Sequence, residues 1–177
     1  MLPNFTTGVF GLFLKFIYQG TYSMRLDQSA SNAGIKIPPS AHAWLMGSVL
    51  GARSFQNHAM HHIYKSIGKL FVITPELIEW CMENTEEGSQ LRQLFMDTLI
   101  VHWNRNTHIV ARSGELDELW EIVFDKHTEL RRLFIFGLKG ETRLADAHSY
   151  FIFTQEEAKK EIKESAEVIK EENVFES

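Results

Sequence analysis

Apolar residues recur every three to four positions along most of the chain, which is the period of an α-helix. The clearest case is residues 38–68, where two such patterns meet at Gly51. Ser40 is the predicted N-cap of the first half. The apolar positions of the two halves are Ala41, Trp44, Leu45, Val49 and Ala52, and then Phe55, Ala59, Ile63 and Ile67. Two short helices with facing apolar stripes and a tight joint predict an αα-hairpin.

The same pattern predicts further helices on both sides of this hairpin. Residues 7–17 form a candidate helix that is apolar on nearly all sides and therefore needs cover. Thr74 and Pro75 mark another helix start, because threonine caps a helix and proline fits its first turn. Three later helices are predicted. One begins after Ser89 as its cap, one covers residues 115–124, and one begins after Thr128 as its cap.

The composition changes after residue 140. A small apolar group at 150–153 (YFIF) is followed by residues 154–177, in which Glu and Lys alternate. Such i,i+4 charge pairs are typical of a solvated helix. This tail holds eight Glu and four Lys, so it carries most of the net charge of −5 and leaves the body nearly neutral. A neutral body argues against nucleic acid as a partner, because phosphate binding requires a basic surface.

Cysteine content and hydropathy indicate the cellular compartment of the protein. The only cysteine, Cys81, has no partner for an internal disulfide, which suits a reducing compartment. No stretch approaches the roughly 20 apolar residues of a membrane span. The opening segment also lacks the basic start and cleavage site of a signal peptide. We therefore expect a cytoplasmic or nuclear protein without a membrane partner.

Four segments of the chain resemble a known family. Residues 9–22 (VFGLFLKFIYQGTY) and 41–67 (AHAWLMGSVLGARSFQNHAMHHIYKSI) resemble the third helix, the Tyr-x-Gly turn and the last two helices of a BTB/POZ domain. Residues 73–103 and 118–138 resemble the helical, BACK-like region that follows this domain in many fungal BTB/POZ proteins. The resemblance covers most of the chain and rests on helical packing patterns without a catalytic motif.

The resemblance implies a shortened member of that family. A BTB domain carries strands and two helices before the segment that corresponds to Val9, whereas Met1 lies eight residues upstream. The usual sheet is then absent, and Phe10, Phe13 and Phe16 need other cover: the loop 21–37, the YFIF group or a second protomer. We expect a mainly α bundle of about seven to eight helices. Its predicted parts are truncated BTB/POZ-like helices (1–70), a helical extension (71–140) and a charged C-terminal helix or tail (141–177).

The expected function is that of a non-catalytic protein–protein interaction module, an adaptor or a scaffold. The partner is either a second copy of the chain or, as the resemblance implies, a cullin-type ubiquitin-ligase scaffold. The loop 21–27 lacks the hydrophobic-x-Glu motif that helps such adaptors bind. The candidate partner-binding residues are Phe13, Phe16, Tyr22, Met24 and Leu26, and packing within the chain is the alternative explanation for them.

The histidines of the NHAMHH segment give the sharpest candidate for chemistry. His58 and His62 are four residues apart and share a helix face, which is the geometry by which paired histidines bind zinc. Ala59 stands where the metalloprotease motif requires Glu, and a third ligand would have to come from His42 or His102 in space. A solvated polar face is therefore expected. A metal-binding or enzymatic protein built on His58, His61 and His62 remains the alternative.

No other residues point to catalysis or to a cofactor. Cys81 lies on an apolar helical face, where a cysteine is usually an inert small hydrophobe. The sequence has no glycine-rich phosphate loop and no G-x-S-x-G elbow. The 38–68 hairpin also has few Arg or Lys on its second helix, so it does not match a DNA-reading helix pair. We therefore predict that the protein is not an enzyme.

Overall fold

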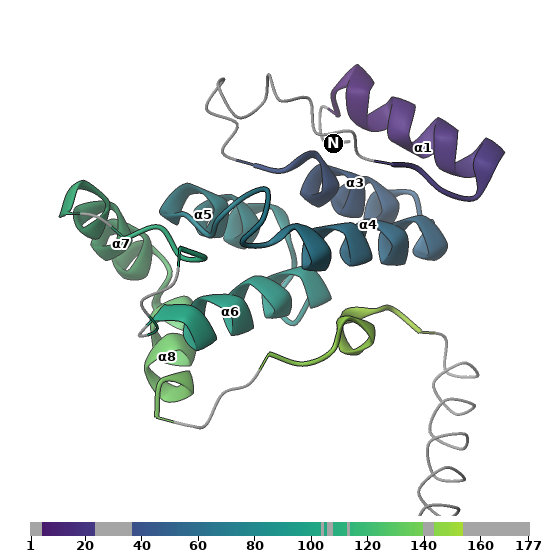
Figure 1. Ribbon diagram of the computed structural model, residues 1–177. Coiled ribbons are helices and arrows are strands. Elements are labelled where there is room, and N and C mark those ends of the chain that lie inside the picture. Colours follow the sequence, from purple (N-terminus) through teal and green to yellow (C-terminus); the bar gives the residue numbers. More distant parts are fainter. Residues whose placement is uncertain are drawn as a thin grey trace, which may run out of the picture.

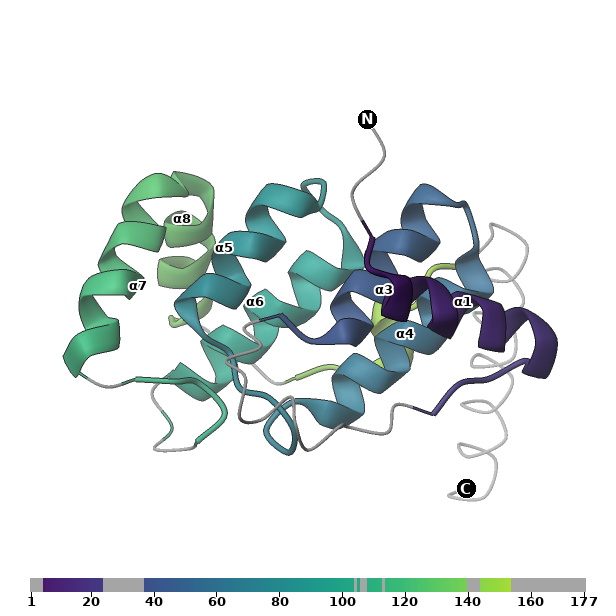
Figure 2. The ribbon, with the colours of Figure 1, turned by 90° about the horizontal axis from the view of Figure 1, so that it is seen from above.

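The computed structural model describes residues 5–23, 37–103, 105, 108–112, 114–139 and 144–153. In these ranges the chain forms seven α-helices, one short 3-10 helix and no β-strand, so the prediction of a mainly α bundle is confirmed. The elements are α1 (Thr7–Gln19), α3 (Pro39–Val49), α4 (Arg53–Ser66), α5 (Pro75–Asn84), α6 (Gln90–Trp103), α7 (Gly114–Lys126), α8 (Thr128–Gly137) and η1 (Ala147–Tyr150). Figures 1 and 2 show α1 beside α3 and α4 at one end of the molecule, with α7 and α8 at the other.

The predicted hairpin is confirmed as α3 and α4. Gly51 joins the two helices with a φ of 64°, which glycine adopts without strain. At their crossing, a Cβ atom added to Gly47 would lie 2.9 Å from the Cβ atom of Gln56, so the close approach requires glycine there. The predicted cap at Ser40 is wrong. The N-cap is Pro38, and Ser40 is buried in the first turn, because the preset φ of Pro39 starts the helix two residues earlier than predicted.

Of the three capped helix starts predicted after the hairpin, two have the predicted N-cap residue. The Oγ1 atom of Thr74 accepts a hydrogen bond from the Leu77 amide at 3.2 Å, and Pro75 occupies the first turn, as predicted. The Oγ atom of Ser89 accepts one from the Arg92 amide at 3.4 Å. Thr128 is not the cap of α8, because α7 extends to Lys126 and leaves His127 as the N-cap.

One continuous hydrophobic core runs from Val9 on α1 to Tyr150 at the end of the described chain. In the connection after α4, Ile73 forms a parallel bridge with Val110, and both residues belong to this core. Trp44 and Trp120 are buried, while Trp80 and Trp103 are half-buried and pack against the core. None of the described helices is long and apolar enough to cross a membrane.

Residues 144–153, which we call the C-terminal strap, pack on α4 and α6 (Figure 1). Tyr150 is fully buried, and its hydroxyl donates a hydrogen bond to Oδ2 of Asp97 at 2.8 Å. The amide side chain of Asn57 bonds both backbone groups of Ile152, at 2.9 and 2.7 Å. The YFIF group, one of the three candidates for covering the phenylalanines of α1, packs instead on α4 and α6. The predicted charged helix at 154–177 lies outside the described residues.

Candidate functional site

The outer face of α1 exposes four large apolar residues. Phe10, Leu14, Ile17 and Tyr18 follow each other at helical spacing and are 49%, 38%, 57% and 84% exposed. On the opposite side of the helix, Val9 is buried in the core. α1 is therefore apolar on both sides but covered on only one. A helix that is apolar all round is normally covered on all sides.

The predicted partner-binding residues fall into three groups. Phe13 and Phe16 are half-buried, and their rings lie 5.1 and 5.3 Å from the ring of Phe55 on α4. Tyr22 is only 2% exposed, which corrects its prediction as a partner contact: its ring belongs to the core. Met24 and Leu26 lie outside the described residues.

The exposed stripe of α1 was missed by sequence reasoning. Its members are spaced by four, three and one residues, but the covered residues of the same helix are equally apolar. The sequence indicates that α1 must be covered by other parts of the protein. Which face of α1 is covered depends on where Phe55 and Tyr22 lie. These two rings pack against each other at 5.6 Å and cap the inner side of α1.

The second notable cluster joins α4 to the segment that follows α1. The Nε2 atoms of His58 and His62 lie 3.2 Å apart. The backbone carbonyl oxygen of Tyr22 lies 3.0 Å from the Nε2 atom of His62 and 3.4 Å from that of His58. The predicted pairing of the two histidines on one helix face is thus present, and the carbonyl oxygen is a third polar atom that no sequence motif indicated.

The backbone fixes where the protons of this cluster sit. The amide of Tyr22 donates to the Nε2 atom of His58 at 3.3 Å, so that nitrogen carries no proton. His62 then donates its Nε2 proton to the Tyr22 carbonyl oxygen. Burial lowers the pKa of His62, with the neighbouring His58 as a further cause, which favours the neutral form of the His62 ring.

The other histidines lie elsewhere. His61 contacts the ring of Phe151 in the strap at 6.4 Å, and the ring of His42 packs on Trp80 at 4.9 Å. Among the described residues, neither His42 nor His102 joins His58 and His62 in a metal-ligating group. The expected solvated polar face does not describe His58 and His62, which are half-buried against the ring of Tyr22 at 4.6 and 4.9 Å.

A different group of possible metal ligands lies between α5 and α7. Single ligand atoms of Glu79, Glu83 and His127 all lie within 4.8 Å of one another. The ammonium of Lys126 donates hydrogen bonds to both carboxylates, which raises the pKa of the lysine to about 12. Lys126 therefore already pairs with both glutamates, and the group is explained as an ion-pair cluster on the surface.

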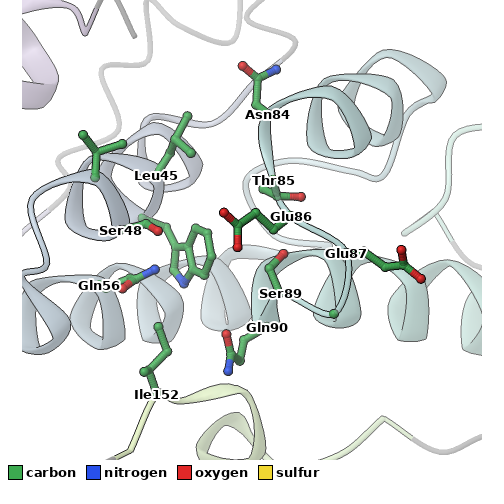
Figure 3. A pocket seen from close by; sticks show the side chains of 13 residues that line it. Leu45, Ser48, Gln56, Asn84, Thr85, Glu86, Glu87, Ser89, Gln90 and Ile152 are labelled. Carbon is green, nitrogen blue, oxygen red and sulfur yellow. The ribbon is translucent and has the colours of Figure 1, made fainter. Parts of the chain in front are cut away.

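A cleft of about 530 Å³ opens between α3 and the turn that joins α5 to α6. In Figure 3, Glu86 reaches into the opening while Glu87 points away from it. The Nε1 atom of Trp44, which lines the cleft, is buried and has no hydrogen-bond partner among the described residues. The lining within the described residues contains no His, Cys, Lys or Arg, so its other polar groups are hydroxyls, amides and carboxylates.

The single thiol is placed as the sequence predicts. Cys81 is 1% exposed, and burial raises its pKa to about 12. Its sulfur lies 3.7 Å from Oγ1 of Thr85. Because the thiolate is the reactive form, a buried thiol with this pKa is inert at neutral pH.

Comparison of the chain with protein-family models, with curated proteins and with solved structures gave no match. The BTB/POZ resemblance therefore rests on the four sequence segments that carry it.

Proposed function

We propose that the protein is a non-catalytic protein–protein interaction module of the BTB/POZ type and that it associates with a second copy of itself through the outer face of α1. The observation that carries this proposal is the exposed stripe of Phe10, Leu14, Ile17 and Tyr18. Clustered exposed aromatic and aliphatic side chains are the usual anchors of protein interfaces.

The composition of α1 favours a second copy as the partner. Its only charged residue is Lys15, which is exposed and lies beside Tyr18 at the edge of the stripe. A two-fold contact between two such helices brings identical apolar stripes together and leaves both lysines at the rim. The contact thus removes apolar surface from water without burying a charge.

The proposal is tested with a matched pair of variants. Ile17 on α1 and Ile122 on α7 are 57% and 58% exposed, so replacing either by Glu costs a similar amount of packing. In light scattering over a range of protein concentrations, we expect the parent chain and Ile122→Glu to form dimers and Ile17→Glu to remain monomeric. Circular dichroism checks that each variant is folded. A parent chain that is monomeric throughout, or equal loss of dimer in both variants, contradicts the proposal.

A cullin-type scaffold is the second partner that the resemblance implies. Most of the loop expected to make that contact lies outside the described residues, and Tyr22 at its start is buried. Retention of a cullin on the immobilised chain supports an adaptor role, and absence of retention removes it without affecting the dimer proposal.

A further inference from the structure

We propose that His58, His62 and the backbone carbonyl of Tyr22 form a binding site for a divalent transition-metal ion, with Zn²⁺ as its simplest probe. The site is independent of the proposed dimer, because none of these three residues belongs to the exposed stripe of α1.

The distances between the three atoms match a coordination shell. Zinc binds imidazole nitrogen at about 2.0–2.1 Å, so ligands of a tetrahedral site lie about 3.3 Å apart. Here the two Nε2 atoms are 3.2 Å apart, and the carbonyl oxygen of Tyr22 is 3.0 Å from one and 3.4 Å from the other. The three atoms therefore already outline one face of a tetrahedron.

Surrounding rings hold the ligands in this arrangement. The ring of Phe16 lies 5.3 Å from that of His58, and the ring of Tyr22 stacks on His62 at 4.9 Å with an interplanar angle of 21°. Both histidines project from one face of α4, four residues apart. A metal ion would meet ligands that are pre-organised by packing, which reduces the cost of ordering them.

The proton arrangement is compatible with metal binding. His58 already presents an unprotonated Nε2 atom, and His62 needs only to move its proton from Nε2 to Nδ1, so no net proton is released. The cost is the 3.3 Å hydrogen bond from the Tyr22 amide to His58. Thr21, whose Oγ1 atom lies 3.4 Å from the same nitrogen, is exposed, so water reaches the cluster and completes the coordination.

The donor set also indicates which ions fit. Two imidazoles and a neutral carbonyl suit Zn²⁺, Cu²⁺ or Ni²⁺. Ca²⁺ and Mg²⁺ prefer oxygen-rich sites with carboxylates, so they serve as negative controls. The bound ion would join the segment after α1 directly to α4 and thereby fasten α1 to the rest of the core.

The first experiment is a calorimetric titration of the full chain with Zn²⁺ at neutral pH. We expect one ion to bind with micromolar affinity, and His58→Ala or His62→Ala to abolish this binding. His61→Ala is the matched control, because it removes a histidine from the same helix that packs on Phe151 instead. His127→Ala tests the ion-pair cluster of Glu79, Glu83 and Lys126, and we expect it to leave binding intact.

Two further measurements keep the proposal falsifiable if an alanine variant fails to fold. His58→Phe retains a ring against Phe16 without a ligand atom, and Zn²⁺ should raise the melting temperature of the parent chain but not of this variant. In the parent chain, nitrogen NMR of the imidazoles should show Zn²⁺-induced shifts at His58 and His62. Absence of binding by the parent chain, loss of binding in His61→Ala or His127→Ala, or shifts confined to other histidines would overturn the proposal.

Discussion

Two segments far apart in the sequence contact different faces of α4. One is α1, which packs mainly on α3, together with the turn that follows it, and the other is the C-terminal strap (Figure 1). The strap is held by neutral groups that bond the backbone. Asn57 pairs with Ile152, and the hydroxyl of Tyr64 donates to the carbonyl of Ala145 at 3.0 Å. α1 and its turn are held by aromatic packing on Phe55 and by the imidazoles of α4.

The two segments differ in how completely their apolar side chains are buried. The strap buries Tyr150 fully and gives its hydroxyl a partner, so this side of α4 is closed. The α1 side leaves a stripe of large apolar residues in water, and the turn after α1 is bonded to the titratable His62. We infer that the strap stabilises the fold, whereas the α1 side carries the exposed apolar stripe on which the dimer proposal rests.

The largest effect is expected where the strap is most buried. Tyr150→Ala removes a fully buried ring and leaves Asp97 without its hydroxyl donor, so the free energy of unfolding should fall by about 3–5 kcal/mol. Urea denaturation followed by circular dichroism measures this loss. A fall of no more than about 0.5 kcal/mol, the range of ordinary surface substitutions, would show that the strap is not an essential part of the core.

A pair of glycine substitutions compares the α3–α4 crossing with α1. Gly47→Ala places a Cβ atom 2.9 Å from that of Gln56, and such overpacking should cost about 1–3 kcal/mol. Gly11→Ala meets no atom within 4 Å and should stabilise α1 by up to about 1 kcal/mol through its better helix propensity. Urea denaturation of both variants gives the sign of each effect. Equal effects would contradict the difference in packing.

The pH dependence of stability probes the imidazoles beneath Tyr22. Burial lowers the pKa of His62 in the folded state, so the unfolded chain binds more protons. The free energy of unfolding should therefore fall as the pH drops through the ordinary histidine value of about 6.5, and the loss is complete below the folded pKa. Urea denaturation at a series of pH values measures this fall, which should be smaller in His62→Gln.

The comparison with His62→Gln is needed because other groups titrate as well. Burial also lowers the pKa of His42, His61 and His102, which contribute in the same direction. Asp97 acts in the opposite sense, since burial raises the pKa of its carboxyl group. Parallel curves for the parent chain and the variant would show that His62 contributes nothing to the pH dependence.

The smallest effect on folding is expected on the outer face of α1. Tyr18 is 84% exposed, so Tyr18→Ala should change the free energy of unfolding by no more than about 0.5 kcal/mol at low protein concentration. At high concentration the same variant should weaken dimer formation, because Tyr18 belongs to the proposed contact. Light scattering and urea denaturation of the same samples separate the two effects. A large loss of stability at low concentration would place Tyr18 in the core of a single chain.

Local sequence features accounted for most of the fold. Hydrophobic periodicity located the α3–α4 hairpin, and the Thr74-Pro75 pair located the start of α5, because a cap and a first-turn proline act within a few residues. The caps predicted at Ser40 and Thr128 failed where a neighbouring proline or a longer preceding helix moved the boundary.

The sequence by itself determined that the chain forms amphipathic helices, that Cys81 is buried, and that His58 and His62 share a helix face. Three facts depend on the tertiary structure alone. They are which face of α1 is covered, the packing of the strap on α4 and α6, and the contact of the Tyr22 carbonyl oxygen with the two histidines. Each of these facts joins residues far apart in the sequence, such as Tyr22 and His62 or Asn57 and Ile152. Hydrophobic periodicity reports only the faces of one helix, and in α1 all faces are apolar, so it carries no information about which distant segment covers them.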